Sequence, residues 1–328
     1  MTTPTTFTAR TPEDVLAAVP CLLGFRPTRS IVMLTFGPGR PFHARIDLPE
    51  RAEQTPEVVR PLVHAVRTHR VARVLLVAYS ADAELAEQVL GELEDALVAA
   101  GAEVCDVLRA EERRWFPMRP GHPEHLYAGV PHDPDSHPFA VQSVLEGRVT
   151  HGSRAELAAT LEPGDPAATE EVGAAALAAA ERLGRRDTAA EATWIRTRLG
   201  RALRDEPLTH AEAGRLLVAL LDLSLRDVAW LAMTRENAGR SVDLWRDVVR
   251  RSPTELLAAP AALLGFAAWL SGHGALAWCA VDRVGLADPD YSLAQLLGRL
   301  LTGAVAPDAW DDLRVEIGPE AGDPDAAG

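Results

Sequence analysis

The side chains best suited to recognising a ligand fall within one stretch of the C-terminal half of the sequence. Asp227 and Trp230 are three residues apart, as are Asp243 and Arg246, so on helices each pair would share one face. Arginine beside tryptophan suits anion recognition, and it is equally typical of a stacked, paired contact inside a helical bundle. Both interpretations stay open for the whole polar–aromatic cluster, which comprises Arg226, Asp227, Trp230, Arg235, Asp243, Trp245 and Arg246.

A second polar group follows the strongest predicted strand, VARVLLVAY (71–79). Open α/β sheets bind ligands outside the carboxyl ends of their parallel strands. Tyr79 and Ser80 stand at such an end, Asp82 follows them, and Arg109 ends the next predicted strand. Asp82 is equally well placed to cap the following helix, and Ser80 to turn the chain.

Half of the ten histidines lie between residues 122 and 151, with acidic residues among them. Neutral imidazoles and carboxylates can bind zinc or another divalent ion. The spacing is irregular and interrupted by prolines, so it does not preset a ligand face. We therefore expect no metal site, and keep one alternative, a metal held by His122, His125 and His132.

The familiar catalytic and cofactor motifs are missing from the sequence. It contains no Gly-x-Gly-x-x-Gly after a strand, no P-loop, no Gly-x-Ser-x-Gly, no Cys-x-x-Cys and no His-Glu-x-x-His. All 33 basic residues are arginines, so no lysine can form a Schiff base. We expect neither a P-loop nucleotide, nor pyridoxal phosphate, nor a Rossmann dinucleotide.

Net charge and cysteine usage restrict the partners and the compartment. A charge of −14 opposes binding to nucleic acid or to an anionic membrane surface. Three distant cysteines indicate no disulfide framework, and no stretch of sequence resembles a signal peptide or a membrane span. These features predict a cytoplasmic protein whose partner is another protein or a small molecule.

The N-terminal half shows the alternation of an α/β domain, which we expect over residues 7–160. Thr11-Pro12-Glu13 opens a helix that ends near Gly24. Strands are predicted at 31–36, 42–48, 71–79 and 105–108, with helices from Thr55 and Asp82 between them, and Gly37-Pro38-Gly39 as a hairpin turn. A hairpin followed by two strand–helix–strand crossovers predicts a mixed, partly parallel sheet with flanking helices. Residues 111–151 are rich in proline and histidine and lack periodicity, so we expect a long loop there.

Helix signals dominate from Ser153 onward. Capping boxes are predicted at Ser153, Thr209 and Ser252, and helices near 166–183, 188–203, 210–223, 225–233, 239–251, 254–271, 274–286 and 291–302. We expect an all-helical bundle over 161–312 and a disordered acidic tail over 313–328. Small residues from Leu264-Gly265 to Pro289 have the spacing of one tetratricopeptide-like αα-hairpin.

Three segments together resemble an actinobacterial family of unknown function. They are LAAVPCLLGFRPTRSIVML (16–34), RVLLVAYS (73–80) and the run from RDVAWLAMTRENA (226–238) through SLAQLL (292–297). The resemblance covers roughly residues 7–312 and implies no activity. Relatives often carry several cysteines in the stretch that matches 115–131. This chain keeps Trp115-Phe116 and Gly129-Val130-Pro131 without those cysteines, which argues against thiol or cysteine–metal chemistry there.

Three functional hypotheses follow. The leading one is a non-catalytic binding or regulatory module, with a partner-docking surface on the helical half and a small ligand held between the halves. The rival is an enzyme of unknown reaction whose site lies between the halves, with loop 111–137 as a lid that brings Arg114 and Trp115 towards residues 227–246. The third is a metal-binding protein that uses the histidine-rich loop.

Overall fold

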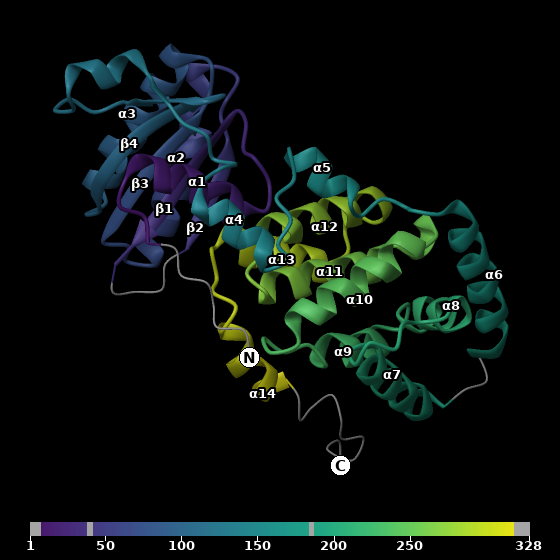
Figure 1. Ribbon diagram of the computed structural model, residues 1–328. Coiled ribbons are helices and arrows are strands. Elements are labelled where there is room, and N and C mark those ends of the chain that lie inside the picture. The colour runs from purple at the N-terminus through teal and green to yellow at the C-terminus, as the bar shows by residue number, and fades with distance from the viewer. Residues whose placement is uncertain (1–7, 38–41, 184–186, 318–328) are drawn as a thin grey trace. The chain divides into compact units, whose positions relative to one another are not determined.

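Two separately packed units make up the chain, the first formed by Met1–Arg154 and the second by Ala155–Gly328. The computed structural model describes residues 8–37, 42–183 and 187–317 (Figure 1). A mixed α/β unit followed by an all-helical unit confirms the predicted fold class. Among the described residues, every helix falls short of the length and apolarity that crossing a membrane requires.

The described part of the first unit contains a six-stranded sheet in the order β2-β1-β3-β4-β5-β6. Its strands are β1 (Ser30–Phe36), β2 (His43–Asp47), β3 (Arg73–Tyr79), β4 (Glu103–Glu111), β5 (Arg114–Pro117) and β6 (Val130–Pro131). β3 and β4 run parallel, whereas the other neighbouring pairs are antiparallel. Both predicted crossovers join parallel strands, because β2 and β3 each run antiparallel to β1, which lies between them.

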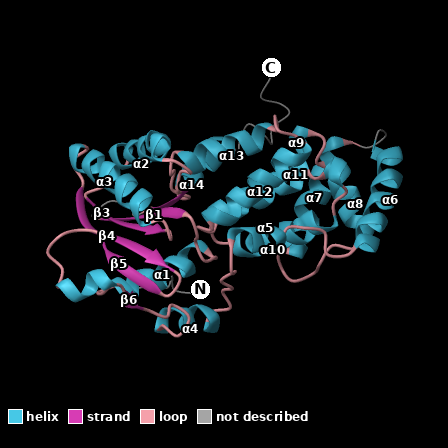
Figure 2. Ribbon diagram, turned by 90° about the horizontal axis from the view of Figure 1, so that it is seen from above, coloured by secondary structure: helices cyan, strands magenta, loops and turns pink. Residues whose placement is uncertain are grey.

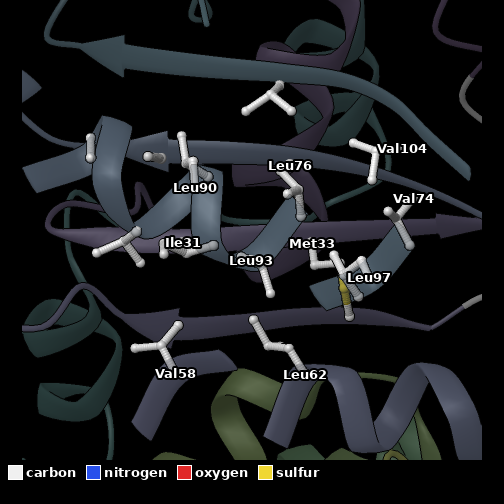
Figure 3. Packing of buried hydrophobic residues seen from close by; sticks show 14 of the residues in the cluster. Ile31, Met33, Val58, Leu62, Val74, Leu76, Leu90, Leu93, Leu97 and Val104 are labelled. Atoms are coloured by element: carbon white, nitrogen blue, oxygen red, sulfur yellow. The ribbon is translucent and has the colours of Figure 1, made fainter. Parts of the chain in front are cut away.

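Helices cover both faces of this sheet, as Figure 2 shows. On one face, α2 (Thr55–Thr68) and α3 (Ala83–Ala99) bury Leu62, Leu93 and Leu97 against Ile31 and Leu76 of the strands (Figure 3). On the other face lies α1 (Pro12–Leu23), with its own apolar core. Burial on both faces explains why β1 and β3 consist of nearly continuous apolar residues.

The helix ends in the first unit follow from the local sequence. Thr11 accepts a hydrogen bond from the main chain of Asp14, whose carboxylate accepts from the main chain of Thr11, which forms a reciprocal capping box. α1 ends at Gly24, whose φ of 77° is readily reached only without a Cβ. The predicted turn at Gly37-Pro38-Gly39 lies largely outside the described residues, and the antiparallel β1–β2 pairing confirms the hairpin.

The prediction that residues 111–151 form only a loop is wrong. The chain reverses at Glu112, which has a φ of 49°, and returns as β5 alongside β4. A short 3-10 helix η2 (Glu124–Ala128), β6 and α4 (Pro138–Leu145) follow. These elements are too short for periodicity to reveal them, since β5 has four residues and β6 has two.

The second unit consists of helices joined by short connections. They are α5 (Arg154–Ala159), α6 (Pro166–Leu183), α7 (Thr188–Ala202), α8 (His210–Ala219), α9 (Leu223–Leu231), α10 (Ala238–Arg251), α11 (Ala258–Leu270), α12 (Gly274–Ala287), α13 (Ser292–Thr302) and α14 (Ala309–Ile317). Two further 3-10 turns are η1 (Ala52–Gln54) in the first unit and η3 (Thr254–Leu256) in the second. α14 continues past the predicted start of the tail, and residues 318–328 lie outside the described part of the chain.

Of the capping boxes predicted in this unit, the one at Thr209 is present and the one at Ser252 is absent. The capping box at Thr209 is present. The box predicted at Ser252 is wrong, because the Ser252 hydroxyl donates back to the carbonyl of Val248 and ends α10.

The predicted helical hairpin is formed by α11 and α12, which pack closely. A Cβ on Gly265 would lie 2.7 Å from Cδ2 of Leu297 in α13 and 3.2 Å from the Cβ of Ala280 in α12, so glycine here allows α11 to approach both helices closely. Its tetratricopeptide character stays a prediction.

Candidate functional site

The polar–aromatic cluster predicted from the sequence divides among three places. Arg226 and Asp227 pair with each other on α9, and Arg235 pairs with Asp311 of α14. Asp243 and Arg246 line a cavity beside α10. The two tryptophans of the cluster lie in apolar packing, which is the structural interpretation that the sequence left open.

Aromatic contacts account for the tryptophans. Trp230 stacks on Trp310 at 4.9 Å between ring centroids and meets Phe266 edge-on at 5.4 Å. Trp245 is 1% exposed. Trp245 is thus closed to a ligand, whereas Trp230 is partly exposed and its indole N–H has no acceptor among the described residues.

Arg226 is held in the interior by its neighbours. Its Nε and Nη2 donate to one oxygen of Asp227, at 2.9 and 2.6 Å, and its guanidinium lies 5.8 Å from the centre of the Tyr291 ring. Burial raises the pKa of Tyr291, partly offset by the charge of Arg226. The arrangement is a partly buried ion pair beside a phenol, and it connects α9 to the start of α13.

The cavity beside α10 has a volume of about 450 Å³. It lies between the first turn of α6 and the last two turns of α10, helices that contact each other in the second unit (Figure 1). Its lining consists of Gly164, Asp165, Ala168, Asp243, Arg246, Asp247, Arg250 and Arg251, which we call the arginine pocket.

The periodicity of α10 places these side chains together. Residues 243, 246, 247 and 250 follow the spacing i, i+3, i+4, i+7, which forms one polar stripe along a helix. Val242, Trp245 and Val249 occupy a neighbouring, buried stripe. Packing of the apolar stripe against the bundle core thus fixes the direction in which the arginines point.

Two arginines of the pocket carry charge that their neighbours do not fully balance. Arg246 lies 3.5 Å from Asp243, and its buried Nε has no hydrogen-bond acceptor among the described residues. Burial lowers the pKa of Arg246, and the like charge of Arg250 lowers it further, against the opposing effect of Asp243. Within the described part of the chain, Arg250 makes no hydrogen bond or ion pair.

Two of the three acidic residues of the pocket already have partners. Asp247 pairs with Arg251, which also donates to the carbonyl of Leu208 at 3.1 Å. Asp165 accepts a hydrogen bond from the main chain of Ala167, at 2.9 Å, and so caps α6. The side chain of Asp243 is 79% exposed. Because the carboxylate of Asp165 occupies the positive end of α6, the pocket charge that is left without a close partner is mainly that of Arg250.

The polar residues at the strand ends have structural partners. The Ser80 hydroxyl bonds the main chain of Asp82, and Asp82 accepts from the main chain of Leu85 and caps α3. Arg109 donates to the carbonyl of Ser80 at 3.0 Å, pairs with Glu111 and lies 4.0 Å above the Phe116 ring. The structural interpretation of Ser80 and Asp82 therefore accounts for both.

The remaining predicted residues of the first unit, Arg114, Trp115 and Tyr79, lie in strands of the sheet. Trp115 is buried and donates to Glu13 at 3.0 Å, and Arg114 donates to the carbonyl of Gly129 at 2.8 Å. Burial raises the pKa of Tyr79, whose hydroxyl has no partner among the described residues.

The histidines of residues 122–151 are dispersed. His122 lies 3.5 Å from Asp106, whereas His125 is exposed on η2. Burial lowers the pKa of His132, and His137 caps α4 while bonding Asp14 at 3.1 Å. The described residues contain no group of three or more histidines, cysteines or carboxylates arranged to hold a metal ion. The metal alternative thus gains no support from the geometry.

The sequence singled out Asp243 and Arg246 but missed the other lining residues of the pocket. The repeat of arginine at 246 and 250 along one helix stripe was visible and could have identified Arg250. Gly164 and Asp165 come from a segment about eighty residues away, and only tertiary packing brings them to α10.

A family model described as Domain of unknown function (DUF4192) matches residues 12–308. No curated protein and no solved structure matches the chain.

Proposed function

Because the chain belongs to the family described as Domain of unknown function (DUF4192), whose description names no activity, we propose a function from the arginine pocket itself. The protein is a non-catalytic binding module that holds a small anion, such as a phosphate or carboxylate group. The proposal rests on one observation: among the described residues the guanidinium of Arg250 has no hydrogen-bond or ion-pair partner, and it lies beside the partly buried Arg246.

Electrostatics support an anion at this position. Arg246 and Arg250 repel each other, and the repulsion contributes to the lowered pKa of Arg246. An anion that accepts hydrogen bonds from both guanidiniums would offset this repulsion. Guanidinium stays protonated at all ordinary pH values, so the site would be charged whenever the protein is folded.

The composition of the lining supports binding without catalysis. Its eight residues are three arginines, three aspartates, one glycine and one alanine, so they include no serine, cysteine or histidine as nucleophile or base. Asp165 and Asp247 are occupied by a helix cap and an ion pair, so Asp243 is the lining carboxylate that is available to accept hydrogen bonds.

Isothermal titration calorimetry with inorganic phosphate tests the proposal. We expect saturable one-to-one binding to the wild-type protein, and a tenfold to roughly hundredfold loss of affinity in Arg250→Gln, the usual effect of losing a charge-assisted hydrogen bond. Glutamine keeps most of the side-chain length, so folding should be unchanged.

Arg196→Gln is the matched control. Arg196 is an exposed arginine on α7 that lies outside the pocket lining, and its substitution changes the net charge equally. We expect this variant to bind phosphate as the wild type does. Equal loss in both variants would show only a general charge effect, and the absence of any phosphate binding would refute the proposed function.

A further inference from the structure

The lining of the arginine pocket contains no hydrophobic or aromatic side chain larger than alanine. Pockets of 300–1,000 Å³ are usually lined by hydrophobic and aromatic side chains around a few polar groups. This cavity of about 450 Å³ has alanine as its largest apolar residue. An acyl chain would find no hydrophobic side chain larger than alanine to pack against, so we expect the body of the ligand to be polar.

The carboxylates limit how the charge of the ligand is distributed. Asp165, Asp243 and Asp247 line the same cavity, and they would repel a ligand that carried negative charge along its whole length. The negative group must therefore lie at one end, beside Arg246 and Arg250. The remainder must donate hydrogen bonds to carboxylate oxygens.

Asp243 indicates that these donors are neutral. Its side chain is 79% exposed, and among the described residues it forms an ion pair only with Arg246, at 3.5 Å, which leaves oxygen lone pairs available. An ammonium group at Asp243 would stand next to the guanidinium of Arg246 and be repelled by it. Hydroxyl groups donate without that repulsion.

From these three constraints we infer that the pocket binds a phosphorylated polyol, with its phosphate on Arg246 and Arg250 and its hydroxyls donating to Asp243. This inference rests on the proposed function, and it names the chemical class of the ligand for that same pocket. It also predicts that Asp243 sets specificity, whereas the arginines supply affinity for the phosphate.

Calorimetry with three probes tests this inference. We expect ribose 5-phosphate to bind at least tenfold more tightly than inorganic phosphate, and adenosine monophosphate to bind no more tightly than ribose 5-phosphate. Asp243→Ala should reduce the preference for ribose 5-phosphate over phosphate to below threefold, while its affinity for inorganic phosphate is kept or rises. Glu181→Ala removes an exposed carboxylate from the other end of α6 and should leave the preference unchanged.

The outcomes separate this inference from the proposed function. Phosphate binding that depends on Arg250, with no gain for ribose 5-phosphate, would overturn the inference and leave the anion site standing. Tighter binding of adenosine monophosphate would overturn it as well, because the base would then be recognised. If neither phosphate nor ribose 5-phosphate binds, both proposals fail.

Discussion

At the scale of single residues, Gly164 governs the position of Arg250. A Cβ built on Gly164 would lie 2.3 Å from Nη2 and 3.1 Å from Cζ of Arg250, far inside van der Waals contact. The guanidinium of Arg250 therefore lies close to the main chain of Gly164, where there is no side chain to displace it. Because the obstructing atoms are the far end of a flexible side chain, Arg250 can move aside at little cost to folding.

Gly164→Ala should consequently weaken phosphate binding without weakening the fold. We expect the phosphate affinity to fall at least fivefold, while the free energy of unfolding changes by less than about 0.5 kcal/mol, as for most surface substitutions. Calorimetry and urea unfolding measure the two quantities. Gly239→Ala is the control, since a Cβ on Gly239 of α10 would meet nothing within 4 Å. Normal phosphate affinity in Gly164→Ala would contradict the role of Arg250.

At the scale of elements, the helices were more predictable than the short strands. Predicted helix 239–251 is observed as α10 (Ala238–Arg251), because its polar and apolar stripes continue over several turns. β5 and β6 were missed, since a few residues cannot show alternation. Of the residues that line the pocket, only those on a single helix could be predicted from the sequence. Asp243 and Arg246 could be found from their spacing, whereas Gly164 depends on how α6 packs.

The α7–α8 connection provides a pH-dependent prediction at this scale. Arg198 of α7 donates to Glu212 at 2.7 Å and to the carbonyls of Glu206 and Pro207, so it joins α7 to the first turn of α8. Hydrogen bonds from Arg198 and from Thr209 lower the pKa of Glu212 to about 2 from its usual 4.5, against the opposing effect of burial.

A lowered folded-state pKa has a definite sign for stability. Between pH 4.5 and 2 the unfolded chain binds a proton at Glu212 that the folded chain does not, so acid favours unfolding in this window. Glu212→Gln removes that proton uptake. We expect its free energy of unfolding to be lower than wild type at pH 7, and the difference to shrink as the pH falls from 4.5 to 2. Urea unfolding across this pH range measures the difference in free energy of unfolding between the variant and the wild type. The control is Glu181→Gln, which removes an exposed carboxylate on α6. A difference that stays constant with pH would contradict the ion pair.

At the scale of the whole molecule, the chain divides into two units with different cores, one around a sheet and one among helices. The α2–α3 core of the first unit uses residues between Ile31 and Val107, together with partly buried neighbours from the same unit. The arginine pocket uses residues 164–251 of the second unit. Separate cores imply that damage to one should leave the chemistry of the other intact.

Leu93→Ala tests that separation. Leu93 of α3 is fully buried among α2 and the sheet (Figure 3), so its truncation should lower the free energy of unfolding of the first unit by about 2–5 kcal/mol, through lost transfer energy and a residual cavity. Val98→Ala on the same helix removes a side chain that is 56% exposed and should cost less than about 0.5 kcal/mol. Differential scanning calorimetry compares the thermal stability of the two variants.

Phosphate titration at 15 °C, where both variants remain folded, measures the phosphate affinity of the pocket. We expect wild-type phosphate affinity in both variants. A loss of phosphate affinity in folded Leu93→Ala would mean that the sheet core supports the pocket. The function could then no longer be assigned to the second unit alone.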